Sequence, residues 1–213
     1  FLRFTFYFFY KFCGIFIKRR KMEETKLDLL KDLGLGESFS NKTLDLIVKT
    51  EHKYVRDLRM NVKSVMESQN LSLKETHLLS IAILSNNGNQ ILLESMKVKA
   101  QSLGVSDLEI ADAIACASLL SANNVFYRFR HFINKESYNT LPARLRMNIM
   151  MSPVLGKEFF ELISLAVSAV NGCEMCVKSH EISVIEAGST EARVWDAIRL
   201  ASVITSLGKI MHD

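Results

Sequence analysis

Two cysteines, a histidine and an upstream glutamate are the residues of this sequence whose types and spacing best suit chemistry. Cys173 and Cys176 lie three residues apart, His180 follows four residues later, and Glu161 precedes Cys173 by twelve residues. A thiol pair at this spacing near a helix start can close a disulfide across one turn, the usual redox arrangement. His180 falls one turn after Cys176 on the same helical face. The spacing therefore predicts a redox site in which Glu161 and His180 relay a proton from Cys176.

The turn that precedes the cysteines indicates how they are positioned. Asn171-Gly172 is unfavourable inside a helix but suits a helix entry, so we expect Cys173 in the first turn of the next helix. Unpaired backbone N–H groups and the helix dipole at that end favour a thiolate over a thiol. Glu161 begins an apolar helix ahead of the turn, and its carboxylate can fold back onto His180.

Each of these residues also has a simpler interpretation. A Cys-x-x-Cys pair can be half of a zinc site, but a structural zinc site needs four ligands, and the sequence has no second pair at ligand spacing. His180 alone suits a surface or capping histidine, and Glu161 alone suits an exposed acid. Cys116 lies in an Ala- and Leu-rich segment and is predicted to be a core thiol. Several methionines are likewise interpreted as core residues rather than metal ligands: Met60, Met66, Met96 and those within 147–151.

An internal repeat shows that only one part of the chain carries this group. Residues 79–121 match residues 163–205 without a gap at an offset of 84, with eleven identities in 43 positions. Both copies contain an Asn-Gly turn. At the positions of the two cysteines and the histidine, the first copy has Asn89, Leu92 and Met96. The scaffold common to both copies therefore does not require the reactive residues.

The composition and the helix signals favour an all-α protein. The 213 residues are 48% hydrophobic and include only two prolines and nine glycines, which excludes intrinsic disorder and disfavours a turn-rich β-fold. Capping-box pairs, Ser72 with Glu75 and Ser106 with Glu109, each precede an apolar segment. Apolar residues recur at helical spacings over 44–65, which predicts one helix there.

The domain organisation follows from the repeat and from the N-terminal segment. We predict a single domain over 22–213, with related helical units at about 72–133 and 156–213 packed about a pseudo-twofold axis. Residues 1–21 hold six cations, no acid and seven of the 13 phenylalanines. Their apolar run is shorter than the roughly 20 residues of a transmembrane helix, and Met22 opens a sequence typical of soluble proteins. We expect residues 1–21 to be translated upstream sequence, with a membrane anchor as the alternative.

The net charge bears on the partners of the protein. The chain carries +4 at pH 7, but residues 22–213 taken alone carry −2 because the six cations of residues 1–21 are excluded. Lys and Arg are therefore not concentrated on the folded part, and we expect no nucleic-acid partner. Redox chemistry of this kind needs a reducing supply, so we expect a cytoplasmic protein unless residues 1–21 are an anchor.

The stretch from Glu161 through Asn171-Gly172-Cys173 to Cys176 and His180 resembles the alkyl hydroperoxide reductase D (AhpD-like) family of the carboxymuconolactone decarboxylase superfamily. The two-copy helical layout is also similar to that family, so the resemblance covers roughly residues 25–213. It implies an all-α AhpD-like fold of two related repeats and a thiol-dependent peroxidase acting on alkyl hydroperoxides. It further implies no bound cofactor, a dithiol reductant such as dihydrolipoamide or a lipoyl protein, a peroxiredoxin partner, and a homo-oligomer, often a trimer.

The resemblance also implies a role for each site residue. Cys176 would be the peroxidatic cysteine that passes through a sulfenic acid, and Cys173 would donate the proton and resolve that acid into the disulfide. His180 and Glu161 would form the proton relay. Some family members have a second histidine between the cysteines, where this sequence has Met175. Decarboxylase members generally lack the cysteine pair, which argues against that activity. The alternative function is a disulfide-exchange adapter that re-reduces a peroxiredoxin and has little peroxidase activity of its own.

Overall fold

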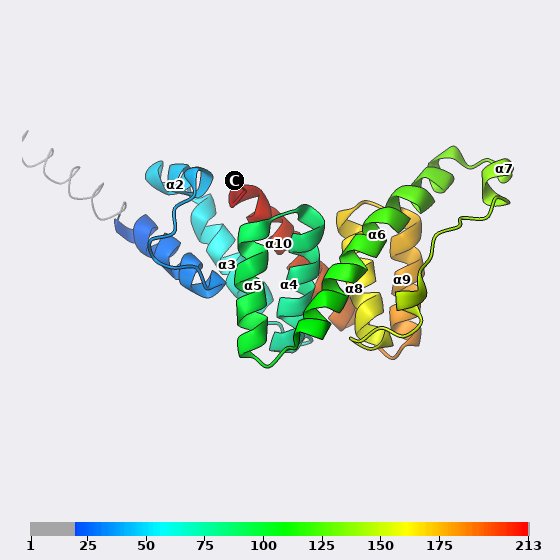
Figure 1. Cartoon of the computed structure of the whole chain (residues 1–213). Helices are drawn as coiled ribbons and strands as arrows, with labels where there is room; N and C mark the ends of the chain where they lie inside the picture. The colour runs from blue at the N-terminus through cyan, green and yellow to red at the C-terminus, as the bar shows by residue number, and fades with distance from the viewer. Residues whose placement is uncertain (1–19, 213) are drawn as a thin grey trace, which may run out of the picture.

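The computed structural model describes residues 20–212, and no strand occurs within that range (Figure 1). The predicted all-α fold is confirmed. Residues 1–19, which make up nearly all of the predicted leader, lie outside the described residues, as does residue 213. In chain order the helices are residues 20–33, α2 (Lys42–Lys49), α3 (Tyr54–Met66), α4 (Leu73–Asn87), α5 (Gln90–Ser102), α6 (Asp107–Ile133), α7 (Glu136–Asn139), α8 (Lys157–Val170), α9 (Glu174–Glu186) and α10 (Glu191–Ile210), with a 3₁₀ turn at Asn148–Met150.

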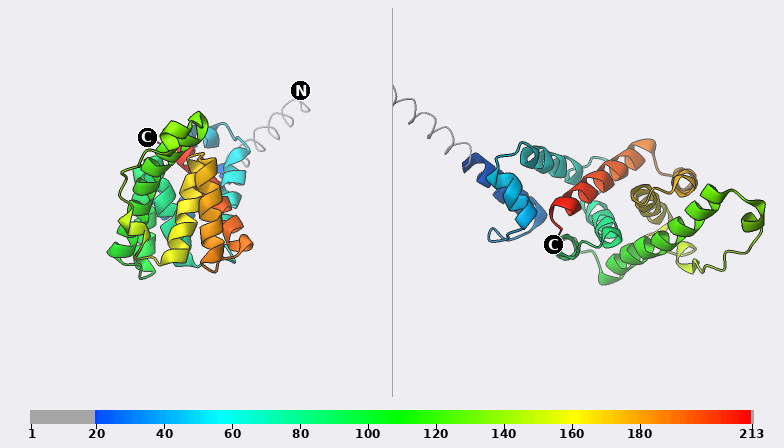
Figure 2. Two further views of the ribbon diagram at one scale, coloured as in Figure 1. Left: turned by 90° about the vertical axis from the view of Figure 1, so that its right-hand side faces the viewer. Right: turned by 90° about the horizontal axis from the view of Figure 1, so that it is seen from above.

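Helices α4 and α8 form the centre of the core. Helix α4 packs against α5, α6, α8 and α10, and α8 packs against α4, α6, α9 and α10. Every residue from Thr76 to Leu84 and from Phe159 to Ser168 is buried. A helix buried on all sides has to be enclosed by other helices. The two views of Figure 2 show the surrounding helices packed around this pair, with α3 and the N-terminal helix beyond α10.

The helix boundaries recur at the offset of 84 residues. Helices α4, α5 and α6 begin at residues 73, 90 and 107, and α8, α9 and α10 begin at residues 157, 174 and 191. Asp112 accepts a hydrogen bond from the backbone N–H of Leu155 (3.0 Å), just before α8. Its counterpart Asp196 accepts one from the Asn70 side chain (2.9 Å), just before α4. Each half of the chain thus accepts a hydrogen bond from the residues just before the first helix of the other half. The limits of the domain remain a prediction.

Local signals explain where these helices begin and end. Both predicted capping boxes are confirmed, at the starts of α4 and α6. The Asn-Gly turns are also confirmed, because Gly88 (φ 71°) and Gly172 (φ 69°) adopt the left-handed conformation that side chains disfavour. These turns reverse the chain between α4 and α5 and between α8 and α9.

The prediction of one helix over 44–65 is wrong. The chain forms α2 and α3 instead, and Glu51, with φ 53°, lies in the break between them. The Thr50 hydroxyl donates to the Leu46 carbonyl (2.9 Å), which caps the end of α2. Buried residues on both sides of the break, Val48 and Val55, keep the helical spacing. The helical spacing of the apolar residues therefore continues across the break, and this spacing alone does not show that α2 ends there.

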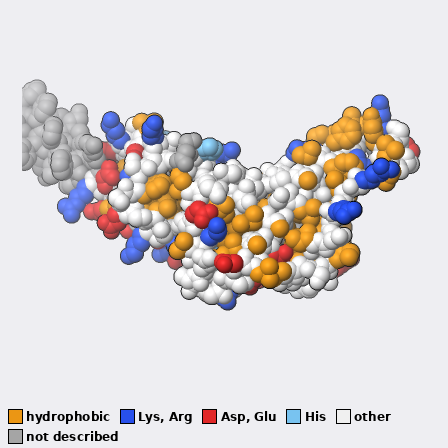
Figure 3. All heavy atoms as spheres, in the orientation of Figure 1, with side chains coloured by type: hydrophobic (Ala, Val, Ile, Leu, Met, Phe, Trp, Pro, Cys, Tyr) orange, Lys and Arg blue, Asp and Glu red, His pale blue; other side chains and the backbone are white. Residues whose placement is uncertain are grey.

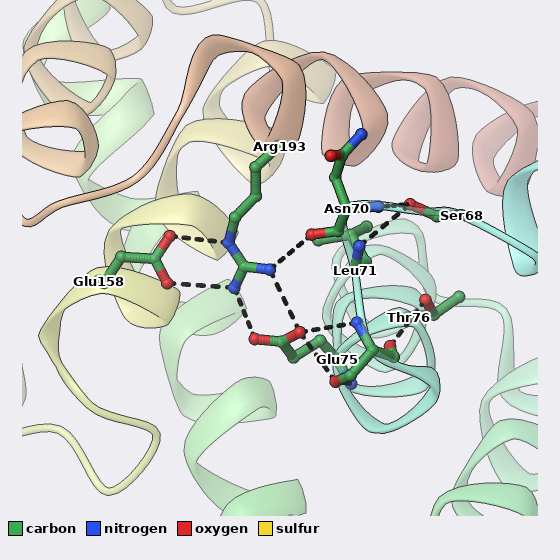
Figure 4. A network of polar contacts seen from close by, with 8 residues as sticks. Ser68, Asn70, Leu71, Glu75, Thr76, Glu158 and Arg193 are labelled. Carbon is green, nitrogen blue, oxygen red and sulfur yellow. Dashed lines mark hydrogen bonds and ion pairs between the residues drawn. The ribbon is translucent and has the colours of Figure 1, made fainter.

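An arginine cluster joins the N-terminal ends of α4, α8 and α10 (Figure 4). The guanidinium of Arg193 donates to both Glu75 (2.5 Å) and Glu158 (2.9 Å), and also to the Asn70 carbonyl (2.8 Å). Burial raises the pKa of the Glu75 carboxyl, but hydrogen bonds from Arg193 and Ser72 outweigh burial and lower it below the ordinary value. The cluster fixes α8, which carries Glu161, relative to α4 and α10.

The C-terminal part of α6 projects from the body together with α7 (Figure 1). By length and composition, α6 is the one helix in residues 20–212 that could cross a membrane, and 44% of its apolar window is buried inside the protein. Exposed apolar side chains gather on this projecting part, as Figure 3 shows. They include Phe129, Phe132, Ile133, Tyr138 and Leu141.

Candidate active site

The two cysteines at the start of α9 form a disulfide. Cys173 and Cys176 are joined sulfur to sulfur, with their Cα atoms 5.3 Å apart. Cys173 is the N-cap residue of α9, one position before the first turn in which it was expected, and Cys176 lies within that turn. Both are largely buried, Cys173 at 1% exposure and Cys176 at 7%. The pair therefore occupies the positive end of the helix dipole.

The helix start differs in one respect from its counterpart in the first half of the chain. Asn89, the N-cap of α5, accepts a hydrogen bond from the Leu92 backbone N–H through its side chain (3.0 Å). Cys173 has a similar backbone conformation (φ −97°, ψ 90°, against −87° and 94° for Asn89) but makes no such bond. The first-turn N–H groups of α9 thus lack a side-chain cap. Such groups stabilise a negative charge on a nearby sulfur.

A histidine–glutamate pair lies beside the disulfide. The Nδ1 atom of His180 is 2.6 Å from Oε2 of Glu161, which is only 2% exposed. Burial raises the pKa of the Glu161 carboxyl, but hydrogen bonds from His180 and Lys157 more than offset it and lower the pKa below the ordinary value. An ionised Glu161 accepts, so Nδ1 of His180 carries the hydrogen and Nε2 is left to exchange a proton. The predicted contact between these side chains is present.

Lys157 is a member of this group that sequence reasoning missed. Its ammonium donates to Oε1 of Glu161 (2.6 Å) and to the Met150 carbonyl (3.3 Å). Lys157 precedes Glu161 by one helical turn on α8, and the i,i+4 spacing of opposite charges is a signal that could have found it. The lysine compensates the buried carboxylate and ties α8 to the segment that holds Met150.

Amide side chains hold the turn between α8 and α9. The Asn171 side chain exchanges hydrogen bonds with Asn86 of α4 (2.9 and 3.1 Å) and donates to Asn124 of α6 (2.9 Å). Arg128 of α6 donates to the Asn171 carbonyl (2.5 Å). The turn that presents Cys173 is therefore fixed from two other helices.

A cavity of about 420 Å³ opens beside Cys176. Its lining is mostly apolar and comes from α6, α9 and the segment 147–150. The lining residues are Leu120, Asn123, Tyr127, Met147, Met150, Met175, Cys176, Ser179 and His180. A small molecule with an apolar part can thus reach the Cys176 sulfur and the imidazole together.

The interpretation of the methionines as core residues is only partly correct. Met96 is fully buried, whereas Met60 is 60% and Met151 is 82% exposed. Met147 and Met150 line the cavity. Their segment lies between α7 and α8, and Met150 packs against the core as well as lining the cavity. The flexible thioether side chain suits such a surface.

The remaining candidates lie outside the site. Cys116 is a core thiol as predicted, because it is fully buried and burial raises its pKa to about 12. His77, at the position that corresponds to Glu161, bonds through Nδ1 to the Leu73 carbonyl (2.7 Å). Over the described part of the chain, no group of three or more His, Cys, Asp or Glu residues is placed to hold a metal ion.

Comparisons with known proteins show which family the chain belongs to. Residues 137–212 match the carboxymuconolactone decarboxylase family. Alkyl hydroperoxide reductase AhpD of Anaeromyxobacter sp. (strain K) is 40% identical over 162 residues, which cover 76% of this chain and 87% of that protein. The proteins of the same name from Rhodopseudomonas palustris (strain BisB18) and Coxiella burnetii (strain Dugway 5J108-111) are 36% and 37% identical, over 78% and 74% of this chain and 91% and 90% of their own. The chain therefore belongs to the AhpD family, a branch of the carboxymuconolactone decarboxylase family.

Proposed function

We propose that this protein is a thiol-dependent peroxidase that reduces alkyl hydroperoxides to alcohols. The observation that supports the proposal best is the Cys173–Cys176 pair at a helix N-terminus, next to a histidine paired with a buried glutamate and open to an apolar cavity. The names of its relatives, alkyl hydroperoxide reductase AhpD, support the same class of substrate. The Cys173–Cys176 disulfide is the state of the cysteine pair after it has reduced one hydroperoxide.

The reaction begins from the reduced pair. His180 accepts the proton of the Cys176 thiol, and the resulting thiolate attacks the terminal oxygen of the hydroperoxide. The O–O bond breaks, the sulfur becomes a sulfenic acid, and the alkoxide takes the proton from the imidazolium and leaves as the alcohol. Cys173 then attacks the sulfenic sulfur, and water leaves as the disulfide forms. One hydroperoxide and two thiols thus yield one alcohol, one water and one disulfide.

Glu161 and Lys157 support this proton transfer. Glu161 holds the Nδ1 hydrogen of His180 and stabilises the imidazolium that forms when the thiol is deprotonated. Lys157, together with His180, keeps the buried Glu161 ionised. We assign His180 as the acid–base group and the other two as positioning residues.

The disulfide has to be reduced again by an external dithiol. We propose dihydrolipoamide, free or on a lipoyl protein, since a reductant on a slender arm can enter the cavity at Cys176. Its thiolate attacks one sulfur, and its second thiol then releases the reduced pair as the reductant closes its own disulfide. A continual supply of dithiol places the protein in a reducing compartment, which we take to be the cytoplasm.

We also propose that the chain forms a homo-oligomer. The projecting part of α6 and α7 exposes a group of apolar side chains that a monomer would leave in water, including Phe132 at 73% exposure. Exposed apolar groups of this kind mark association surfaces. A trimer is the state that the family resemblance implies.

The test of the function is hydroperoxide consumption by the full chain with dihydrolipoamide as reductant. We expect turnover by the wild type and none by Cys176→Ser or Cys173→Ser. A Cys176→Ser protein that consumes hydroperoxide at the wild-type rate would contradict the proposal. Consumption only after a peroxiredoxin is added would favour the adapter function instead.

A further inference from the structure

Asn123 is a buried polar residue of the cavity that the reaction above does not use. It lies on α6 with 5% exposure and shares the cavity lining with Cys176 and His180. Its Nδ2 atom donates to the sulfur of Met147 (3.1 Å), and its Oδ1 atom is buried and accepts no hydrogen bond from any residue in 20–212. A thioether is a weak acceptor, so most of the hydrogen-bonding capacity of this carboxamide is unused.

The neighbouring Asn124 shows that this helix can satisfy a buried amide. Asn124 donates to the Ser168 hydroxyl (3.0 Å) and accepts from Asn171 (2.9 Å). Its two polar groups are both paired, as is usual for buried amides. An unpaired buried carboxamide lowers stability relative to an apolar side chain of the same shape. The placement of Asn123 is therefore better explained by a ligand than by folding.

We propose that Asn123 binds the hydroperoxy group of the substrate, an inference that rests on the peroxidase function proposed above. A hydroperoxide has one O–H donor and two acceptor oxygens, which match the acceptor and donor of a carboxamide. The O–H donates to Oδ1, and Nδ2 donates to the oxygen bonded to the alkyl carbon. The terminal torsion of the asparagine side chain is soft, so the carboxamide of Asn123 can rotate to face the substrate. This rotation gives up only the hydrogen bond to the Met147 sulfur.

This arrangement also orients the substrate for attack. The alkyl part packs against the apolar lining, for which Leu120, Tyr127 and Met150 provide the surface. The terminal oxygen then faces the Cys176 sulfur. As the S–O bond forms and the O–O bond breaks, negative charge develops on the oxygen that Nδ2 contacts, and a donor at that atom stabilises it.

Asn123 should matter mainly to one half of the catalytic cycle. Hydroperoxide takes part only in the oxidation of the cysteine pair, so a loss of Asn123 should slow that half. Reduction of the disulfide by dihydrolipoamide takes place in the same cavity but involves no hydroperoxy group, so its rate should fall much less than the rate of oxidation. A residue with a merely structural role would affect both halves and the melting temperature together.

The experiment compares Asn123→Leu with the wild type in stopped-flow measurements of each half-reaction, with cumene hydroperoxide as oxidant and dihydrolipoamide as reductant. We expect the second-order rate of oxidation to fall about tenfold, which corresponds to roughly 1.4 kcal/mol, and the rate of reduction to change far less. The melting temperature should be equal or higher, because an unpaired buried amide is removed. If the leucine side chain does not fit and the variant fails to fold, Asn123→Ala replaces it. This variant removes the carboxamide and should show the same ratio of the oxidation rate to the reduction rate. The matched control is Asn61→Leu, at an exposed position on α3 outside the cavity lining.

The outcomes distinguish this inference from the function on which it rests. If the wild type is oxidised by hydroperoxide and both Asn123 variants keep its rate, the inference is wrong and the peroxidase proposal stands. Equal losses in both half-reactions with a lower melting temperature would assign Asn123 a structural role and also overturn the inference. A wild type that is not oxidised by any alkyl hydroperoxide would overturn the peroxidase proposal, and this inference with it.

Discussion

Replacing Cys173 by serine should stabilise the reduced protein while abolishing its turnover. The backbone at Cys173 matches that of Asn89, whose side chain caps α5, but the Cys173 side chain makes no cap. Serine is among the preferred N-cap residues, and a hydroxyl there can accept the backbone N–H of Cys176. A gained cap contributes about 1 kcal/mol, which for a chain of this size raises the melting temperature by about 2–4 °C.

The assay is thermal unfolding in excess reductant, so that the disulfide of the wild type makes no contribution. The control is Cys176→Ser, which replaces a sulfur inside the first turn, where no cap is to be gained. We expect only Cys173→Ser to unfold at a higher temperature than the reduced wild type. A Cys173→Ser protein that unfolds at or below the temperature of the reduced wild type would refute the reasoning that α9 begins uncapped.

Three further predictions concern the relay, the arginine cluster and the assembly. His180→Gln should lower turnover about 10²-fold by removing the acid–base group, and Glu161→Gln should lower it less because the imidazole remains; steady-state rates at matched dithiol concentration check this order. Arg193→Met should lower the free energy of unfolding in urea by about 1–3 kcal/mol at neutral pH, since the part-buried Glu75 and Glu158 lose their partner. The pKa of Glu75 is lowered in the folded wild type, so the difference in free energy of unfolding between the wild type and Arg193→Met is fully present above the ordinary pKa of glutamate. This difference should shrink as the pH falls through the lowered pKa of Glu75. Phe132→Glu should reduce the molar mass measured by light scattering and leave the helical circular dichroism unchanged, whereas an unchanged mass would exclude this surface from the assembly.

The main parts of the candidate site could be predicted because their signals are local. Asn171-Gly172 marks a helix entry, and the Cys-x-x-Cys spacing with His180 one turn later is fixed by helix geometry alone. The contact between Glu161 and His180 requires only that two helices joined by a tight turn lie antiparallel, and α8 and α9 do so. The capping boxes likewise depend on side chains three residues apart.

The parts that sequence reasoning missed depend on tertiary packing. Asn123 and Tyr127 belong to a long helix with apolar residues on several sides, and only the crossing of α6 with α9 selects the face that lines the cavity. Met147 and Met150 lie in a segment with little regular structure, where no periodicity indicates burial. The break between α2 and α3 was missed because the buried residues on each side of it keep helical spacing.

A single turnover of the reduced full chain tests the central claim most directly. The protein is reduced, freed of reductant and treated with one equivalent of cumene hydroperoxide, and its thiols and intact mass are then measured. The account predicts that one alcohol forms per chain, that the mass falls by two hydrogen atoms, and that the new disulfide joins Cys173 to Cys176 while Cys116 stays reduced. Hydroperoxide left unconsumed, or consumed while Cys173 and Cys176 remain thiols, would contradict it.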